Sequence, residues 1–383
     1  MKNFIILGGT GSIGSQVLDL IKENQEQLLG FSFNNNIAKA LEIIDTFKPK
    51  YVACMNKEDS LVIKNKYPNI IVFLSKEGLV DLVKVKEENL YIVNALVGSI
   101  GLLPSYEVVS RGLDLYLANK ETLVIGGSLI NQKCGETGSK IIPIDSEHSA
   151  IYQLLKGQNN KEISKLYITA SGGAFRDYSI EDLKDVSVND ALKHPNWSMG
   201  KKITIDCATM MNKCFELIEA HYLFNIDIDK IIPLLHKESI VHSMVEFNDY
   251  SIFAQMSNPD MHLPIEYAIF ENHEKHISNL SPLDFSNLNL SFTPLNEERF
   301  KLITLSRLVL KKGGYYPTIL NAVNEVAVEM FLNNKIKFID IEKMIFDEIN
   351  NASIYYQDYI NDILSIDKII ELDQKIKNKY KQI

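Results

Sequence analysis

Two acidic residues that could hold a metal ion stand two positions apart in segment 143–148 (Pro-Ile-Asp-Ser-Glu-His). If this segment is extended, Asp145 and Glu147 point to the same side, because side chains alternate along an extended chain. Two convergent carboxylates repel each other unless a proton or a cation lies between them, and hard divalent cations prefer oxygen ligands. The pair therefore indicates a metal site, with a solvated turn as the alternative.

A third acidic residue, Glu216, ends segment 210–216 (Met-Met-Asn-Lys-Cys-Phe-Glu), which we expect to be helical. Glu219 follows three positions later, on the same face of that helix. A single helical glutamate usually faces solvent. Glu216 is therefore a candidate ligand only in combination with the first pair.

Polar side chains suited to an anion occur in three further segments. Residues 171–173 (Ser-Gly-Gly) follow an expected strand, and such a turn can cradle an anion with its backbone. His194 precedes the only tryptophan, Trp197, and Asn212 precedes Lys213. Together these segments offer the hydroxyl, imidazole, amide and ammonium groups of a phosphate site.

A glycine-rich loop lies close to the N-terminus. Residues 8–14 (Gly-Gly-Thr-Gly-Ser-Ile-Gly) follow an apolar run and precede a helical pattern, and Gly9, Gly11 and Gly14 satisfy the Gly-x-Gly-x-x-Gly fingerprint. In that context, glycines permit a tight turn and the helix N-terminus binds a pyrophosphate. The loop predicts dinucleotide binding, and a tight strand–helix turn is the alternative.

The second expected strand is followed by Asn34, Asn35 and Asn36. A carboxylate at this place would bind the ribose 2′-hydroxyl of NAD and repel a 2′-phosphate. No carboxylate and no arginine is present, so NADP is favoured by the missing acid and by the amide donors.

Short apolar runs and helical patterns alternate over the first ~150 residues, which predicts a parallel sheet with helices on both faces. The expected strands here are Phe4–Leu7, Gly30–Phe33, Tyr51–Cys54, Ile70–Phe73, Tyr91–Ala95 and Leu115–Ala118. Further strand-like runs are Leu166–Ala170, Ile203–Asp206 and Ser251–Gln255.

We therefore expect an α/β protein: an N-terminal Rossmann-type parallel sheet, a central α/β catalytic domain with a mobile lid, and a C-terminal helical bundle. The expected bounds are 1–144, 145–280, a linker at 281–296, and 297–383. The lid is assigned to the aperiodic segment 175–202, because long segments without periodicity are often functional lids. In the last domain, Ile319, Val323, Val326 and Met330 have helical spacing, and Ser365 could cap a final helix.

The composition narrows the classes of function. The chain has 383 residues, with 40 Lys and Arg against 49 Asp and Glu, and a net charge of −9. This charge disfavours nucleic-acid binding, which depends on phosphate neutralisation. No apolar run is long enough for a membrane span or a signal peptide. The four cysteines form no Cys-x-x-Cys pair and no disulfide framework, so we expect a cytoplasmic protein.

These residues resemble the 1-deoxy-D-xylulose 5-phosphate reductoisomerase family in order and spacing along essentially the whole chain. The resemblance rests on a set of short blocks, of which 194–200 (His-Pro-Asn-Trp-Ser-Met-Gly) is highly specific. The blocks are 8–14, 117–121, 144–148, 171–173, 194–200, 206–216, 240–245 and 259–261.

The resemblance implies rearrangement of a phosphorylated sugar and its reduction by NADPH to 2-C-methyl-D-erythritol 4-phosphate. This is the first committed step of non-mevalonate isoprenoid synthesis. It also implies a homodimer, a lid over the substrate, and one divalent cation (Mg, Mn or Co) held by Asp145, Glu147 and Glu216. With Lys120 these three form the expected catalytic set.

The resemblance also assigns binding residues. Substrate contacts are expected from Lys120, Ser146, Glu147, Ser171, His194, Cys207, Asn212, Lys213 and Glu216. NADPH contacts are expected from Thr10, Gly11, Ser12, Ile13, Asn34, Asn35, Asn36, Asn119, Glu121, Met199 and Gly200, with Met199 near the nicotinamide.

The sequence departs from the family pattern at three places. Asn34 to Asn36 replace a Gly-Lys-Asn at the adenosine phosphate position, which predicts a weaker preference for NADPH. Cys207 stands where the family has a phosphate-binding serine, and a thiol is a weaker donor than a hydroxyl. Cys214 stands where the family usually has glycine.

Two other classes of function share the glycine loop. An NADP-linked aldehyde or semialdehyde enzyme would need a nucleophilic cysteine and no metal. A nucleotide-sensing regulator would have no use for Asp145, Glu147 and Glu216 together.

Overall fold

The computed structural model describes residues 1–159, 162–197, 199–271 and 280–381. Ser198 of the block 194–200 lies outside these ranges. The chain forms two compact units. The first comprises the described residues of 1–122, 128–145 and 260–280, and the second those of 123–127, 146–259 and 281–383. The expected bounds of the domains remain a prediction.

The first unit alternates strands and helices, as the apolar runs predict. Its strands are β1 (Asn3–Leu7), β2 (Gln27–Phe33), β3 (Tyr51–Cys54), β4 (Ile71–Leu74), β5 (Leu90–Asn94), β6 (Leu115–Leu117) and β7 (Ile141–Pro143). Its helices are α1 (Ser12–Glu23), α2 (Ile37–Phe47), α3 (Lys57–Lys66), α4 (Ser75–Val83), α5 (Leu102–Ser110), most of α6 (Lys120–Thr137), and α11 (His262–Phe270).

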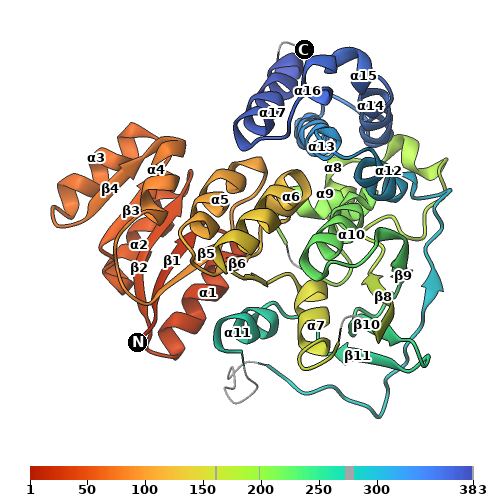
Figure 1. Cartoon of the computed structure of the whole chain (residues 1–383), viewed down its shortest axis with the longest axis horizontal. Coiled ribbons are helices and arrows are strands. Elements are labelled where there is room, and N and C mark those ends of the chain that lie inside the picture. The colour runs from red at the N-terminus through yellow and green to blue at the C-terminus, as the bar shows by residue number, and fades with distance from the viewer. Residues whose placement is uncertain (160–161, 198, 272–279, 382–383) are drawn as a thin grey trace. The chain divides into compact units, whose positions relative to one another are not determined.

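The strands of this unit form a seven-stranded sheet in the order β4-β3-β2-β1-β5-β6-β7 (Figure 1). All its strand pairs are parallel. The direction of winding reverses between β1 and β5, and ligands bind at such a switch point beyond the carboxyl ends of the strands. The glycine loop follows β1 and therefore lies at the switch point.

Apolar side chains hold the first unit together. Phe4, Ile6 and Phe31 of the sheet pack with Val17 and Ile21 of α1 in one buried cluster. Ile265 and Ala268 of α11 join the same cluster, and the Lys2 ammonium donates to the Ile269 carbonyl at 2.5 Å. The chain thus returns to the first unit long after leaving it.

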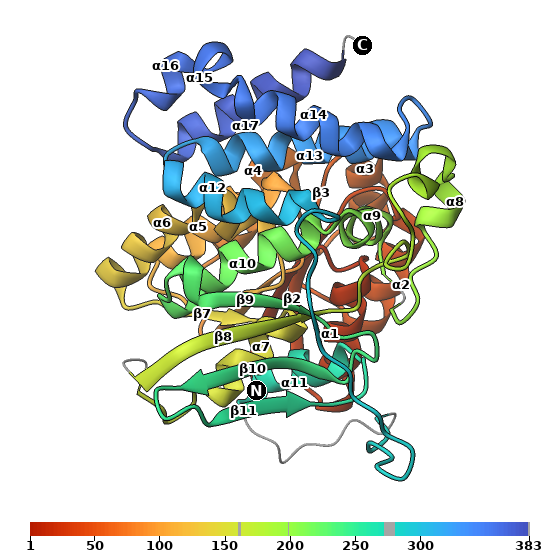
Figure 2. The same ribbon diagram turned by 90° about the vertical axis from the view of Figure 1, so that its right-hand side faces the viewer.

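The second unit contains a mixed sheet in the order β11-β10-β8-β9-β12. Its strands are β8 (Ile163–Ala170), β9 (Ile231–Leu235), β10 (Val241–Phe247), β11 (Ile252–Met256) and β12 (Thr293–Pro294). Only the β8–β9 pair is parallel. Helices α7 (Ser146–Leu154) and α10 (Met211–Phe224) contact this sheet, and α9 (Lys201–Thr209) packs on α10 (Figure 2).

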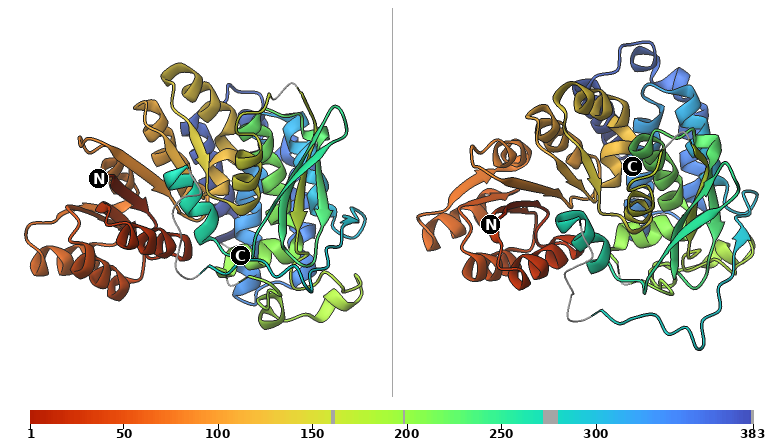
Figure 3. Two further views of the ribbon diagram at one scale, coloured as in Figure 1. Left: turned by 90° about the horizontal axis from the view of Figure 1, so that it is seen from below. Right: turned by 60° about the horizontal axis from the view of Figure 1, so that its bottom comes forward.

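The end of the chain is helical, and Figure 3 shows this region in blue. Its helices are α12 (Leu305–Lys312), α13 (Tyr316–Leu332), α14 (Phe338–Asn350), α15 (Ala352–Tyr355), α16 (Gln357–Ile360) and α17 (Ile366–Lys381). Ile319, Val323 and Val326 are buried on α13, as their spacing predicts. The Ser365 hydroxyl accepts from the Lys368 amide at the start of α17, which confirms the predicted cap.

The predicted α/β class is confirmed, with a parallel first sheet, a second sheet and a helical C-terminal region. One strand prediction was wrong, because Ile203–Asp206 lies inside α9. Short apolar runs do not distinguish a strand from a buried helix. Strands β7, β9, β10 and β12 were not predicted.

Segment 175–202 contains a 3-10 turn at Asp182–Asp185 and a short helix, α8 (Val188–Ala191). Its beginning is anchored, because the buried Phe175 ring packs edge-on against Phe338 with centroids 4.9 Å apart. Its movement as a lid remains a prediction. Among the described residues, no helix combines the length and the hydropathy needed to cross a bilayer.

Candidate active site

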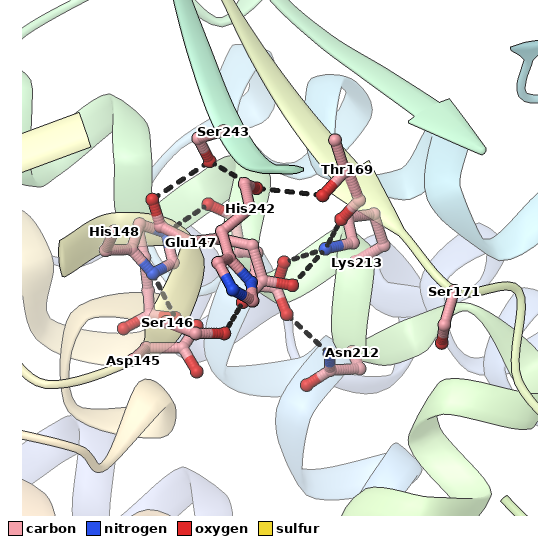
Figure 4. Close-up of polar contacts among 12 residues, drawn as sticks. Asp145, Ser146, Glu147, His148, Thr169, Ser171, Asn212, Lys213, His242 and Ser243 are labelled. Carbon is pink, nitrogen blue, oxygen red and sulfur yellow. Dashed lines mark hydrogen bonds and ion pairs between the residues drawn. The ribbon is translucent and has the colours of Figure 1, made fainter. Parts of the chain in front are cut away.

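Three carboxylates from two separate parts of the sequence lie together. One oxygen from each of Asp145, Glu147 and Glu216 lies within 4.8 Å of the others. Asp145 directly precedes α7, Glu147 lies in the first turn of α7, and Glu216 lies on α10 (Figure 4 labels the first two). The expected extended Asp-x-Glu segment was wrong, because α7 begins at Ser146. The first helical turn, rather than strand alternation, brings this pair together.

The Lys213 ammonium lies between two of these carboxylates. It donates to Glu147 Oε1 at 2.9 Å, and also to Glu216 Oε2 and the Thr169 carbonyl. Only 3% of Lys213 is exposed. Burial alone would lower the pKa of Lys213, but the charges of Glu147 and Glu216 raise it above its ordinary value. Lys213 is therefore charged and neutralises this pair of carboxylates.

Other polar side chains orient the carboxylates. The Lys120 ammonium donates to Asp145 Oδ2 at 2.5 Å. The Ser146 hydroxyl donates to Glu147 Oε2 at 2.5 Å, and the Asn212 amide donates to Glu216 Oε1 at 2.5 Å. Asn212 and Glu216 are four residues apart on α10, a spacing that places side chains side by side.

The arrangement fits a divalent cation. Carboxylate oxygens are ligands that Mg²⁺ and Mn²⁺ prefer, and the buried Lys213 ammonium marks the place as favourable for positive charge. Asp145 is also grouped with the buried His148 and Glu219. This second set replaces one oxygen ligand with an imidazole nitrogen, and His148 Nε2 already bonds to the Glu216 carbonyl at 2.9 Å. The three-carboxylate set is therefore the better site for a hard cation.

The expected phosphate residues Ser171 and His194 are in contact. Ser171 Oγ lies 3.1 Å from His194 Nε2. His194 Nδ1 accepts from the amides of Trp197 at 2.9 Å and Asn196 at 3.2 Å. Because Nδ1 is an acceptor, the proton of the neutral ring lies on Nε2 and is directed at Ser171. Burial, with a smaller effect of the Arg176 charge, lowers the pKa of His194 to about 4.

We expect His194 to be neutral in the ligand-free protein at pH 6. Between its ordinary pKa of 6.5 and its folded pKa of about 4, only the unfolded chain takes up this proton. Protonation therefore destabilises the fold as the pH falls through this window. A ¹⁵N NMR titration, assigned with a His194→Asn variant, should give a midpoint well below 6.5 and the Nε2–H tautomer. A midpoint at 6.5 would show that the ring is solvated.

The turn 171–173 packs against the end of α9. Gly172 and Gly173 both have positive φ angles, and a Cβ added at Gly173 would lie 2.5 Å from the Cys207 carbonyl oxygen. Cys207 is thus placed beside the turn by backbone packing. Arg176 Nη1 donates to the Ser171 carbonyl at 3.0 Å and adds a cation to this region.

The glycine loop has the geometry of a dinucleotide site. Gly8, with φ +87°, begins the turn, and the Gly8 and Gly9 amides donate to Ser32 Oγ and O at 2.9 and 2.8 Å. Gly11 caps α1 without a side-chain hydrogen bond. The first turn of α1 can therefore direct its N–H groups at a phosphate. Thr10, Gly11, Ser12 and Ile13 all lie in this loop or at the start of α1.

Replacing Gly14 with alanine should abolish dinucleotide binding. An added Cβ would lie 2.3 Å from the Gly8 carbonyl oxygen and 2.8 Å from Gly9 Cα, so the loop would have to open. We expect a stability loss of about 1–3 kcal/mol as well. Titration with NADPH and urea unfolding measure both effects.

Gly135→Ala is the matched control, because nothing lies within 4 Å of a Cβ added there, on α6. Alanine is favoured over glycine in a helix by roughly 0.5–1 kcal/mol, so this variant should bind normally and be slightly more stable. Normal binding by the Gly14 variant would contradict the role of the loop.

Asn119 and Glu121 have a structural task in addition to their expected cofactor contact. Asn119 caps α6 by accepting from the Thr122 amide at 3.0 Å, and it donates to the carbonyls of Leu96 and Gly98 at 3.0 Å. Its amide also donates to Glu121 Oε2 at 2.9 Å.

The other expected cofactor residues lie elsewhere. Asn34, Asn35 and Asn36 are exposed after β2, and in the second unit Met199 and Gly200 precede α9.

Four site residues were not predicted: His148, Thr169, Arg176 and His242. The Ser243 hydroxyl donates to the Glu147 carbonyl at 2.9 Å, which places β10 beside α7 (Figure 4). His242 is buried, bonds to Ser257 Oγ at 2.9 Å and lies 6.2 Å from the Trp197 ring. His148 and His242 occur in quoted blocks, and a histidine next to acidic or hydroxyl residues was the available signal.

Three of the four cysteines are not suited to thiohemiacetal chemistry. Burial raises the pKa of Cys214 far above its ordinary value, and it raises the pKa of Cys134 to about 11. Burial also raises the pKa of Cys54. A nucleophilic cysteine needs a lowered pKa. These three thiols therefore do not support a semialdehyde enzyme.

Comparisons with known proteins point to the same family over most of the chain. Models of 1-deoxy-D-xylulose 5-phosphate reductoisomerase match residues 4–127, and models of its C-terminal domains match 141–224 and 256–379. The reductoisomerase of Macrococcus caseolyticus is 46% identical, over 96% of this chain and 97% of its own.

Two solved structures have the same fold. A DOX-P reductoisomerase in complex with NADPH, fosmidomycin and magnesium has a TM-score of 0.92 at 35% identity, covering 100% of this chain and 98% of its own. The Zymomonas mobilis enzyme in complex with NADPH has a TM-score of 0.87 at 32% identity, covering 99% and 98%.

A doubly wound parallel sheet with a glycine loop at its switch point defines a dinucleotide-dependent oxidoreductase, here combined with an oxygen-rich cation site. The family models and the relatives narrow this class to enzymes of a single reaction. The chain belongs to the 1-deoxy-D-xylulose 5-phosphate reductoisomerase family.

Proposed function

We propose that this chain rearranges 1-deoxy-D-xylulose 5-phosphate and reduces it with NADPH to 2-C-methyl-D-erythritol 4-phosphate, with one divalent cation (Mg, Mn or Co). The observation that carries the proposal is the convergence of Asp145, Glu147 and Glu216 in a chain of this family. Solved relatives bound to NADPH and magnesium support both cofactors. The reaction belongs to non-mevalonate isoprenoid synthesis.

When bound, the cation supplies Lewis-acid polarisation of the substrate's carbonyl and adjacent hydroxyl, where negative charge develops. Asp145, Glu147 and Glu216 hold it, and Ser146 and Asn212 keep two of these carboxylates oriented. The Lys120 ammonium places a positive charge beside the Asp145 carboxylate, which would hold the cation. We assign to Lys120 the role of charge or proton partner.

The phosphate of the substrate is assigned to the turn 171–173 and its neighbours. The Ser171 hydroxyl and the neutral His194 Nε2–H supply donors without charge. Asn212 and Lys213 add an amide and an ammonium from the start of α10. The Cys207 thiol is the weakest donor of this set.

NADPH is assigned to the glycine loop and the residues around it, and when bound it supplies the hydride. Its pyrophosphate is expected against Thr10 to Ile13, at the uncapped start of α1. Met199 and Gly200 are assigned to the nicotinamide end by the resemblance alone.

We assign a lid function to 175–202 and expect Trp197 to report its closure. Trp197 is half-buried and is the only tryptophan. Adding NADPH with fosmidomycin should shift its emission to the blue and quench it, because closing lids exclude water from the site. NADPH alone should quench with little shift. An emission maximum that the ligands leave unchanged would contradict the lid.

We also propose a homodimer. β11 is an edge strand of the mixed sheet, and Ile252 and Phe253 on it are half-exposed. Exposed apolar edge strands are sites where a second chain adds. Light scattering of the purified chain tests this. The cytoplasm is the proposed compartment, in line with the free cysteines.

The direct test is NADPH oxidation in the presence of 1-deoxy-D-xylulose 5-phosphate. Oxidation should require both the substrate and a divalent cation, should stop in EDTA and should return with Mg²⁺ or Mn²⁺. Full turnover in EDTA, or none with any of the three cations, would contradict the proposed function.

A further inference from the structure

The turn after β2 lacks the basic residue that usually binds the 2′-phosphate of NADPH. Asn34, Asn35 and Asn36 are exposed there, and Asn36 caps α2 by accepting from the Lys39 amide at 3.1 Å. This turn adjoins the glycine loop, because Ser32 at the end of β2 bonds to the Gly8 and Gly9 amides. In a doubly wound fold, the ribose 2′ position is bound beside this strand end.

Lys39 brings a cation to this place from the first turn of α2. Its ammonium donates to Ser15 Oγ, and Ser15 lies in the first turn of α1. The Ser15 hydroxyl in turn donates to the Gly11 carbonyl at 2.6 Å. Lys39 therefore bridges from α2 to the start of the helix that follows the glycine loop.

The Lys39 ammonium has capacity left for a ligand. Among the described residues, the Ser15 hydroxyl is its only acceptor, and no carboxylate pairs with it. An ammonium carries three N–H donors, so two remain. Lys39 is half-buried, which holds its side chain in one direction more firmly than a fully exposed lysine.

Other lysines of the same unit are less well placed. Lys22 lies in the last turn of α1, and Lys48 caps the opposite end of α2. Lys57 begins α3, after β3, and is exposed. Of these four lysines, only Lys39 is bonded to a residue at the start of α1.

We propose that Lys39 recognises the 2′-phosphate of NADPH and restores the selectivity that a basic residue at 34–36 would give. The inference rests on the proposed function, because it assumes that NADPH binds at the glycine loop. The ammonium pairs with the phosphate dianion, and the Asn34 to Asn36 amides add neutral donors. NADH presents a hydroxyl at this position and gains no such ion pair.

The test compares Lys39→Met with wild type in the full-length protein. Methionine keeps the length of the side chain and its helix propensity but removes the charge. The dissociation constants of NADPH, NADH, 2′,5′-ADP and 5′-AMP are measured by calorimetry or fluorescence. Lys39→Met should raise the dissociation constants of NADPH and 2′,5′-ADP by about ten- to a hundredfold, the range for a charged hydrogen bond. The dissociation constants of NADH and 5′-AMP should change by less than about twofold.

Two further variants serve as controls. Lys39→Arg should keep most of the preference, because a guanidinium also pairs with phosphate. Lys22→Met removes a lysine from the other end of α1 and should alter none of the four constants.

Equal weakening of NADPH and NADH would overturn the inference, because Lys39 would then serve the shared pyrophosphate or only hold Ser15. Unchanged binding of all four ligands would overturn it as well. Failure of the proposed function looks different, since wild type would then not oxidise NADPH with 1-deoxy-D-xylulose 5-phosphate. Wild-type turnover together with an unchanged preference in Lys39→Met refutes the inference alone.

Discussion

Glu216→Gln should lower kcat by about a thousandfold, because several kcal/mol of Lewis-acid stabilisation are lost with the cation. Glutamine keeps the shape of the side chain but removes the charge of a buried ligand, of which 1% is exposed. NADPH binding should stay nearly unchanged, because the glycine loop contains none of the three carboxylates. Turnover and NADPH affinity, measured on one preparation at saturating Mg²⁺, separate the two effects.

Glu329→Gln is the matched control, because Glu329 is exposed on α13 and lies outside the cluster. Its kcat should be within about twofold of wild type, as expected for a surface substitution. Asp145→Asn should behave like the Glu216 variant. Near-normal turnover by either ligand variant would show that the metal assignment is wrong.

Lys213→Met should destabilise the metal-free protein by about 3–5 kcal/mol, because removing one partner leaves buried charges uncompensated. The Lys213 ammonium contacts Glu147 Oε1 at 2.9 Å and Glu216 Oε2, and both carboxylates would lose it. Urea unfolding in EDTA measures this loss. Mg²⁺ should then stabilise the variant more than it stabilises wild type, because the cation binds the folded state without competing with an ammonium.

Lys311→Met is the control for the loss of a lysine. Its ammonium pairs with Asp229 at 3.2 Å, but 63% of its side chain is exposed. Surface pairs contribute about 0–1 kcal/mol, so little change is expected. If Lys213→Met is as stable as wild type in EDTA, the ammonium does not neutralise the carboxylate pair.

The features that the sequence predicted well depend on short stretches of chain. The glycine loop needs only a strand, a turn and a helix in succession, and Gly8 to Gly14 supply the turn. The buried face of α13 follows from the spacing of Ile319, Val323 and Val326. In both cases neighbours in sequence are neighbours in space.

The features that were missed depend on distant residues. Glu147 and Lys213 are 66 positions apart, so their ion pair exists only after α7 and α10 pack in the same unit. Asp206 was placed in a strand, but it lies on α9, where it accepts from Lys202 four residues away and from Asn324 on α13. A run such as Ile203–Asp206 has no periodicity of its own, so tertiary packing decides its structure.

The most direct measurement is the position of Mn²⁺ in crystals of this chain, located by anomalous scattering. We expect one peak per chain, bound by oxygens of Asp145, Glu147 and Glu216 at about 2.0–2.3 Å, and no peak in Glu216→Gln. We also expect the Lys213 ammonium to move away from Glu147 and Glu216. A peak between Asp145, His148 and Glu219, or no bound Mn²⁺ at saturating concentration, would contradict the assignment of the metal site.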